Sequence, residues 1–262
     1  MSRIGRVSII SLGFPIETPD AQQWLKTERR TWIWVGQYAD KPAVFKLYRH
    51  REPWHTLRCA ITRYRVERED RAMRHLSAHG VACSEPLGWA RGHCAEHGFY
   101  ELLIMGLAPR SVDLQTLIGK GYRPDVTALF TLARAMHDAG VCSQVLCSRN
   151  ILVVDPERTP SFMLIDFPRA RIFPSSVVGT RMANHDLAML VEDLTGQGIE
   201  PSPSQISCYG MTRNEALAIK AAAANRRGGK IARRLIDVES RFHHLLAYLR
   251  FKTRVGETHQ RE

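Results

Sequence analysis

Four polar residues have the types and the order along the chain that phosphoryl transfer from a nucleotide would use. Lys46 lies in an apolar stretch, an acid follows in the next helical segment, and Asn150 and Asp166 come later. Asn150 ends the loop "VCSQVLCSRN" (141–150), and Asp166 lies in the apolar run "FMLIDF". A lysine holds phosphates, a glutamate positions that lysine, and amide and carboxylate oxygens bind Mg²⁺. The four residues together predict a nucleotide and metal site.

The loop that ends at Asn150 holds no acid and no histidine. Asp138 precedes the loop on a helical segment, and we expect its side chain to point away from the site. Cys142 and Cys147 have no neighbouring base in the loop to activate them, so we interpret them as small apolar residues. A metal site formed by these two cysteines with His137 is the alternative. The reactive group of a phosphotransferase is therefore missing from the place where it is expected.

Composition favours a globular protein with a sizeable core. The 262 residues are 44% hydrophobic and 24% charged, which is ordinary for a globular chain. No stretch has the length of a membrane span, and the first twenty residues do not make a convincing signal peptide. The six cysteines include no CxxC pair. We therefore expect a cytoplasmic protein with reduced thiols.

The formal net charge of +11 predicts an anionic partner. Residues 211–262 hold twelve Lys and Arg against five Asp and Glu. A solvated helix face explains this surplus equally well. A phosphorylated glycolipid and an anionic inner-membrane surface are the expected partners. No zinc finger, aromatic ladder or arginine-rich run indicates a specific nucleic-acid module.

The apolar patterns predict a strand-rich first part and a helix-rich second part. A hairpin is expected over 31–48 with its turn at 39–41, a helix over 60–80, and strands over 87–90 and 100–105. Helices are expected from a Ser111 N-cap, over 123–140 with Gly140 at its end, and over 185–194 and 215–251. The predicted paired strands are "NILVV" and "FMLIDF".

This order predicts an α+β fold with two lobes in one domain. Residues 1–105 would form a small antiparallel β lobe with one helix, and residues 106–262 a larger helical lobe. Gly106 would lie at the hinge. A cleft between two lobes is a natural ligand site.

Several motifs resemble the lipopolysaccharide kinase (Kdo/WaaP) family of the protein-kinase-like fold. They are "AVFKLYRHR", "VEREDRAMRHLSAHGVACSEPLGW", "ELLIMGLA", "LARAMHDAGVCSQVLCSRNILV", "LIDFPRAR" and "NHDLAMLVEDL". The resemblance covers roughly residues 20 to 200, and its block from 137 to 171 is the most specific. It implies a kinase that uses ATP and Mg²⁺ and acts on inner-core sugars in lipopolysaccharide biosynthesis.

The resemblance implies a role for each matching residue in the first lobe. Lys46 would pair with the nucleotide phosphates and Glu69 would pair with Lys46. We prefer Glu69 to Glu67 because Met73 fills the apolar position four residues further on. Main-chain atoms near Met105 would receive the adenine.

In the second lobe, the resemblance makes Asn150 and Asp166 the Mg²⁺ ligands. Phe167 would pack beneath the helix of the first lobe. Asp186 would brace the loop 141–150 from below.

Two positions of that loop depart from the family pattern. The general base of this fold is an aspartate five residues before the metal-binding asparagine, and here that residue is Val145. The lysine expected two residues later is Cys147, and Arg149 is displaced from it by two positions. An isopropyl group accepts no proton, so no residue of this chain is assigned as the catalytic base.

The leading hypothesis is therefore a pseudokinase-like protein that binds ATP and Mg²⁺, with impaired or lost phosphoryl transfer, in envelope lipopolysaccharide assembly. The first alternative is an active sugar or lipopolysaccharide kinase, a transferase with a non-standard base. The second alternative is an interaction scaffold that binds no nucleotide.

Overall fold

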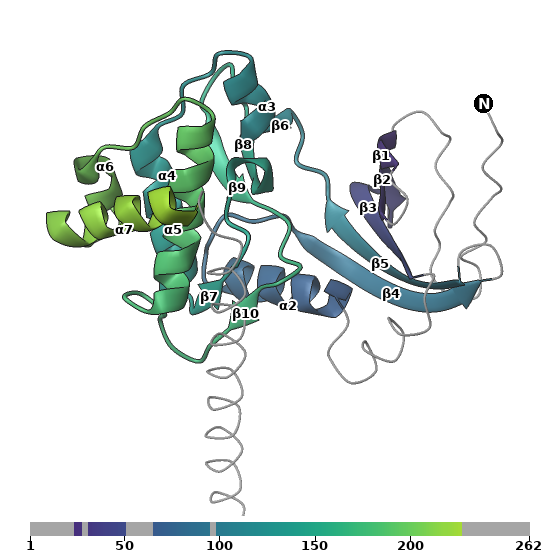
Figure 1. Ribbon diagram of the computed structural model, residues 1–262. Helices are drawn as coiled ribbons and strands as arrows, with labels where there is room; N and C mark the ends of the chain where they lie inside the picture. Colours follow the sequence, from purple (N-terminus) through teal and green to yellow (C-terminus); the bar gives the residue numbers. More distant parts are fainter. Residues whose placement is uncertain (1–23, 28–30, 51–64, 95–97, 227–262) are drawn as a thin grey trace, which may run out of the picture.

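A five-stranded antiparallel sheet lies at one side of the molecule and most of the helices lie at the other (Figure 1). The computed structural model describes residues 24–27, 31–50, 65–94 and 98–226. The strand order in the sheet is β1-β2-β3-β5-β4. The strands are β1 (Trp24–Thr27), β2 (Thr31–Tyr38), β3 (Lys41–His50), β4 (Pro86–Cys94) and β5 (Gly98–Gly106). The prediction of an α+β fold is confirmed.

The predicted hairpin is formed by β2 and β3. Ala39 and Asp40 make its two-residue turn with φ values of 48° and 62°, as tight antiparallel hairpins require. Side chains alternate along β3, so Phe45 and Leu47 are buried in a cluster on one face of the sheet. Lys46 and Tyr48 therefore share the opposite face, where the sheet meets the rest of the protein.

Helix α2 (Arg65–Ala78) packs against β4 and β5 on that opposite face. Val66, Met73 and Leu76 are buried in the main core at positions that share one side of a helix. Glu69 lies on the same side. The residues before Arg65 in the predicted helix over 60–80 lie outside the described part of the chain.

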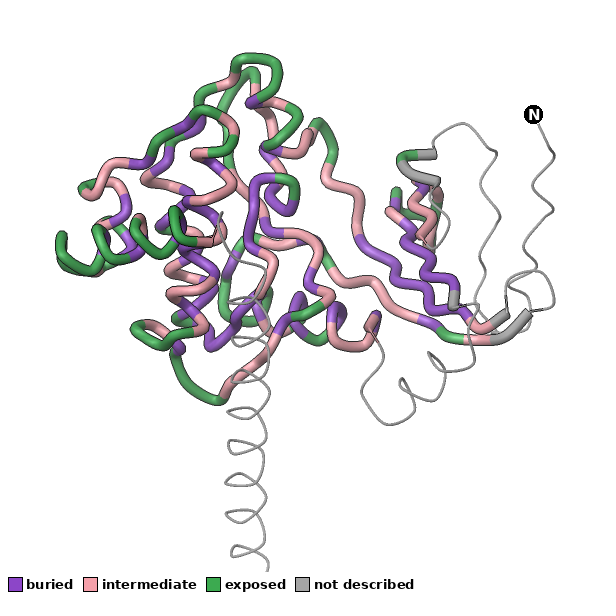
Figure 2. The backbone as a smooth tube through the Cα atoms, in the orientation of Figure 1, coloured by how far each residue is buried: buried purple, intermediate pink, exposed green. Residues whose placement is uncertain are grey.

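The remaining elements build the helical part around the same main core. Its helices are α3 (Leu114–Gly119), α4 (Val126–Asp138), α5 (Arg181–Gly196), α6 (Pro203–Ser207) and α7 (Arg213–Arg226), with the 3-10 turn η2 (Ser148–Asn150). Its strands are β6 (Ser111–Asp113), β7 (Val141–Cys142), β8 (Ile151–Val154), β9 (Ser161–Leu164) and β10 (Arg171–Ile172). The buried stretches run through the sheet and this helical part (Figure 2).

The helix predicted to start at Ser111 starts later. Ser111 to Asp113 form β6, which pairs with β8, and Ser111 Oγ donates to the carbonyl of Ala108. Asp113 is the N-cap of α3 because its carboxylate accepts from the amide and hydroxyl of Thr116. Both residues are good caps, and strand pairing excludes the first of them.

The helix predicted over 185–194 lies within α5, and α7 covers the described start of the helix predicted over 215–251, whereas the predicted strand over 162–167 ends earlier, at Leu164. The helix over 123–140 is α4, with Gly140 in a left-handed conformation just beyond its end, and the paired strands are β8 and β9. Most of the basic segment 211–262 lies outside the described residues. Among the residues described, no helix combines the length and the apolar run that crossing a bilayer demands.

Candidate nucleotide and metal site

Lys46 and Glu69 form a buried ion pair between the sheet and α2. The distance from Lys46 Nζ to Glu69 Oε2 is 3.2 Å, and the two side chains are 8% and 1% exposed. A buried lysine is unfavourable without an anionic partner, so the pair explains how Lys46 is tolerated within an apolar strand. The partner is Glu69, not Glu67.

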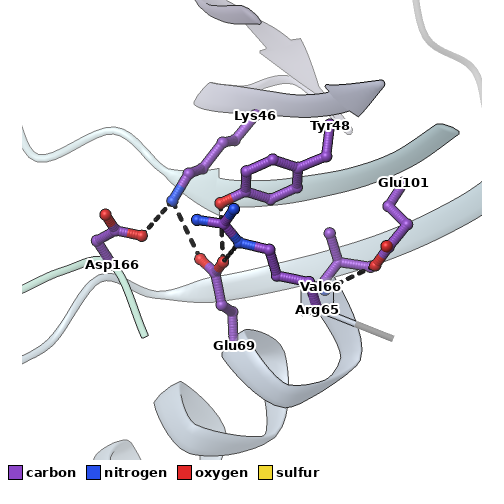
Figure 3. A network of polar contacts seen from close by, with 7 residues as sticks. All are labelled: Lys46, Tyr48, Arg65, Val66, Glu69, Glu101 and Asp166. Atoms are coloured by element: carbon purple, nitrogen blue, oxygen red, sulfur yellow. Dashed lines mark hydrogen bonds and ion pairs between the residues drawn. The ribbon is translucent and has the colours of Figure 1, made fainter. Parts of the chain in front are cut away.

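Glu69 accepts hydrogen bonds from two further side chains that the sequence analysis did not identify (Figure 3). The Tyr48 hydroxyl donates to Glu69 Oε1 at 2.8 Å, and Arg65 Nε donates to the same oxygen at 3.3 Å. Burial raises the pKa of Tyr48 well above its usual range, and the Glu69 charge raises it further. Tyr48 therefore stays a protonated donor at neutral pH.

The start of α2 is held by a buried carboxylate from the sheet. The backbone N–H of Val66 donates to Glu101 Oε2 at 3.0 Å, and Glu101 is fully buried in β5. A negative charge at the first turn of a helix satisfies an amide that has no intrahelical acceptor and complements the helix dipole. Glu101 thus sets the position of α2, and with it the position of Glu69.

Asp166 reaches Lys46 from the opposite side of the ion pair (Figure 3). It lies two residues after β9 with a φ of 62°, and its Oδ1 is 2.5 Å from Lys46 Nζ. Its side chain is 32% exposed, more than those of Lys46 or Glu69. Phe167, the next residue, is buried in the main core that also contains the apolar side of α2. A non-glycine residue with positive φ costs energy and is held here by its neighbours on both sides.

Asn150 is held beside the segment that carries Asp166. Its carbonyl accepts from the amide of Ile165 at 2.9 Å, which extends the pairing of β8 and β9. The Asn150 side-chain amide Nδ2 donates to the carbonyl of Val145 at 2.7 Å. This bond fixes the orientation of the Asn150 side-chain amide, and its role as a metal ligand stays a prediction.

The loop 141–150 is anchored to α5 at both ends. Asp186 accepts from the amides of Ser143 at 2.8 Å and Gln144 at 2.7 Å, and Gln144 has a φ of 61°. Seven residues further along α5, Asp193 accepts from the amide of Ser148 at 2.7 Å. The side chain of Gln197 donates to Asp193 and to the Ser148 hydroxyl. The loop is therefore fixed by carboxylates beneath it.

Val145 is half-buried between these two anchors, and its neighbours in the loop are apolar or neutral. Asp138 does not approach the loop from the preceding helix. Its carboxylate is 47% exposed, pairs with Arg134 at 2.7 Å and accepts from Ser176. The expectation that Asp138 points away agrees with the structure.

The two cysteines of the loop are buried, and neither is arranged as a nucleophile. Burial raises the pKa of the Cys142 thiol, and the nearby Asp186 charge raises it further. Burial likewise raises the pKa of Cys147. Thiols with raised pKa values are poor nucleophiles and poor metal ligands because both roles need the thiolate.

The structure does not bring together the three residues of the alternative metal site, Cys142, Cys147 and His137. Ligand atoms of His137, Cys142 and Asp186 lie within 4.8 Å of one another, whereas Cys147 is not in this group. The His137 ring makes contacts with the Tyr209 hydroxyl at 2.7 Å and with Asp186 at 3.3 Å, and Asp186 also holds two loop amides. Both ring nitrogens are thus engaged, and the cluster is interpreted as a structural brace.

Met105 lies near the end of β5, beside Val44 of β3 and Pro86 of β4. The chain leaves the sheet one residue later, at Gly106, whose amide donates to the carbonyl of Glu85. This is the segment that the sequence analysis expects to receive the adenine. Its role stays a prediction, as does the hinge between residues 105 and 106.

Comparisons with known proteins identify the fold and the family of this chain. The model of the lipopolysaccharide kinase (Kdo/WaaP) family matches residues 20–207. A solved structure described as WaaP in complex with acyl carrier protein is similar with a TM-score of 0.55 and 17% identity, over 78% of this chain and 84% of that one. At this identity the likeness shows a shared kinase-like fold. A search of curated proteins found no match. Because the family model covers most of its length, the chain belongs to the lipopolysaccharide kinase (Kdo/WaaP) family.

Proposed function

We propose that this protein binds ATP together with Mg²⁺ and that its phosphoryl transfer is impaired or lost. The observation that carries the proposal is the identity of residue 145. A valine occupies the position of the base, in a loop whose backbone is held by Asp186 and Asp193. Side chains that bind nucleotide and metal do not depend on that position. Binding is therefore separable from chemistry in this site.

The residues around Asp166 fit a magnesium ion. Magnesium prefers oxygen ligands and commonly takes one or two carboxylates from the protein in addition to phosphate oxygens. Asp166 would supply a partly exposed carboxylate, and Asn150, whose amide nitrogen is held by the Val145 carbonyl, would supply its amide oxygen. Lys46, which contacts Asp166 before any ligand binds, would turn to the nucleotide phosphates, and Glu69 would hold it in place.

Loss of the base lowers the rate without removing the other contributions. A positioned general base typically contributes about 10²- to 10⁴-fold to a rate. In phosphoryl transfer, positioning and electrostatic stabilisation carry most of the catalysis. A slow residual transfer is consistent with the proposal, and transfer at the rate of an ordinary kinase is not.

The biological setting follows from the family and the charge. We place the protein in envelope lipopolysaccharide assembly, at the cytoplasmic side of the inner membrane. A phosphorylated glycolipid suits the surplus of positive charge. A phosphorylated ligand of this kind would bind less tightly as salt rises.

A thermal-shift titration with ATP and Mg²⁺ tests nucleotide binding. A ligand at 100 times its dissociation constant stabilises the folded state by about 2.7 kcal/mol. The wild-type protein should gain melting temperature with ATP and Mg²⁺ together, and Asp166→Ala should lose most of that gain. Asp138→Ala is the matched control because Asp138 is an exposed aspartate away from the site. No stabilisation of the wild type at millimolar nucleotide would overturn the proposal.

A further inference from the structure

Among the residues that the structure describes, Arg65 is the one cation beside Lys46 that contacts the Glu69 carboxylate. Lys46 approaches Oε2 and Arg65 approaches Oε1, so the same carboxylate holds two positive groups next to each other. Figure 3 shows the guanidinium directed from the start of α2 toward the Lys46 ammonium. Two adjacent cations at one end of a ligand site are the usual means of binding several phosphate oxygens.

The guanidinium of Arg65 is fixed in place by an aromatic ring. Its central carbon lies 4.0 Å from the centroid of the Tyr48 ring, in a cation–π contact. The Arg65 side chain is 38% exposed, whereas that of Lys46 is 8% exposed. Of the two cations, Arg65 is thus the one with the more exposed side chain.

Arg65 also has unused hydrogen-bond donors. It uses Nε toward Glu69, and among the described residues neither terminal nitrogen has an acceptor. A guanidinium carries five N–H donors in a rigid fork that matches phosphate oxygens. The stacked ring and the bond to Glu69 determine the orientation of this fork before a ligand arrives.

The charges of the site explain why a second cation is needed. Without Arg65, Lys46 would face the carboxylates of Glu69 and Asp166 alone, and the cluster would be negative. Position 147, where the family pattern has a lysine, holds a buried cysteine. Arg65 restores the balance of two positive and two negative groups, and it does so from α2 instead of from the loop.

We infer that Arg65 is a phosphate-binding residue of the nucleotide site, and that with Lys46 it forms a two-cation site for the outer phosphates of a nucleoside triphosphate. This inference rests on the proposed nucleotide binding. Arg65 on α2 would thus supply the positive charge that a lysine at position 147 would supply from the loop. The inference also predicts that affinity depends on the number of phosphates in the ligand.

The test compares adenosine, AMP, ADP and ATP, each with Mg²⁺, by titration calorimetry. A hydrogen bond to a charged group contributes enough that its loss weakens binding about tenfold or more. Arg65→Gln should weaken ATP binding by that factor, ADP binding less, and adenosine binding hardly at all. Arg74→Gln is the matched control because Arg74 lies on the same helix, pairs with Asp70 and is 54% exposed.

A second variant separates phosphate binding from an effect through Glu69. Tyr48→Phe removes a donor to Glu69 and leaves the guanidinium and the aromatic ring in place. If Arg65 acted only by holding Glu69, the two variants would weaken ATP binding equally, and the inference would be wrong. Equal losses for adenosine and ATP in Arg65→Gln would also overturn it. Failure of the wild type to bind any nucleotide would instead remove the proposed function itself.

Discussion

The two halves of the site, the β-lobe side and the loop 141–150, differ in the charged side chains that they contribute. On the β-lobe side, Lys46 contacts Glu69 and Asp166, and each charge has a partner within hydrogen-bond distance. On the loop side, Val145 and Cys147 stand where the resemblance to the family leads us to expect an aspartate and a lysine. Both halves are nevertheless well anchored. In the loop half, therefore, the residues that keep the backbone ordered are not the ones from which chemistry is expected.

The reason lies in what supports each half. The charged half is supported by its own functional side chains, so loss of one leaves another buried and unpaired. The loop is supported through its backbone amides by Asp186 and Asp193 from α5. Loop side chains that make none of these contacts can change at little cost to the fold, so the loop keeps its conformation with Val145 where the family pattern leads us to expect an aspartate.

The largest effect is expected from Lys46→Met. Removal of the ammonium leaves Glu69 and Asp166 without their shared partner, which costs about 3 kcal/mol or more for a buried pair. Affinity for ATP with Mg²⁺ should fall by about 100-fold, since charged hydrogen bonds to phosphate are lost. Denaturant melts and calorimetry measure the two effects. Lys41→Met, an exposed lysine at the start of the same strand, is the control and should change neither.

A smaller effect on stability is expected from Asp186→Asn. The variant keeps one oxygen acceptor for the loop amides and loses its charge, which we expect to cost about 2 kcal/mol. Hydrogen exchange at the amides of Ser143 and Gln144 should accelerate, while exchange in the β lobe should not. Unchanged protection of those two amides would contradict the role of Asp186 as the anchor of the loop.

Asp193→Asn should act on the other end of the loop and cost less. Its carboxylate holds one loop amide, that of Ser148, where Asp186 holds two. The expected cost is about 1 kcal/mol. Exchange at the Ser148 amide should accelerate selectively. Acceleration over the whole loop, equal to that in Asp186→Asn, would show that the two anchors are not separate.

The smallest effect concerns Tyr48 and has a pH dependence. Burial raises the pKa of Tyr48 above its ordinary value of 10.0, so the folded state holds this proton more tightly than the unfolded chain does. Its contribution to stability is complete below pH 10.0 and is lost as the pH rises toward the folded pKa. Tyr48→Phe should cost about 1 kcal/mol at neutral pH. Above pH 10 the unfolding free energy of the variant should fall less steeply than that of the wild type, and equally steep slopes would contradict this account of Tyr48.

Sequence patterns identified the residues whose own side chains are expected to bind the nucleotide or the metal. Lys46 stands alone in an apolar strand, and Asn150 and Asp166 are separated by a recognisable pair of strands. The structure places Lys46 and Asp166 in contact and holds Asn150 next to the segment of Asp166. The spacing of Asn150 and Asp166 along the paired strands was sufficient to place their segments side by side, whereas Lys46 was assigned to the same site through the resemblance to the family.

The residues that sequence reasoning missed hold other residues in place, and Arg65 has in addition the phosphate-binding role that we infer for it. Tyr48 lies two residues after Lys46, on the same face of its strand, and Arg65 lies four residues before Glu69, on the same face of its helix. Those spacings were signals that could have been used. Glu101 and Asp193 had no such signal, because their partners are backbone amides from distant segments.

We propose that the protein binds a nucleotide but lacks a catalytic base. The most direct test of this proposal is the rate of ADP release by the Val145→Asp variant. With ATP, Mg²⁺ and an inner-core lipopolysaccharide acceptor, the variant should release ADP at least about 100-fold faster than the wild type, because a base is restored to an ordered loop. Asp166→Ala added to this variant should abolish the gain. Equal rates of ADP release in the wild type and Val145→Asp, with nucleotide bound in both, would contradict the account.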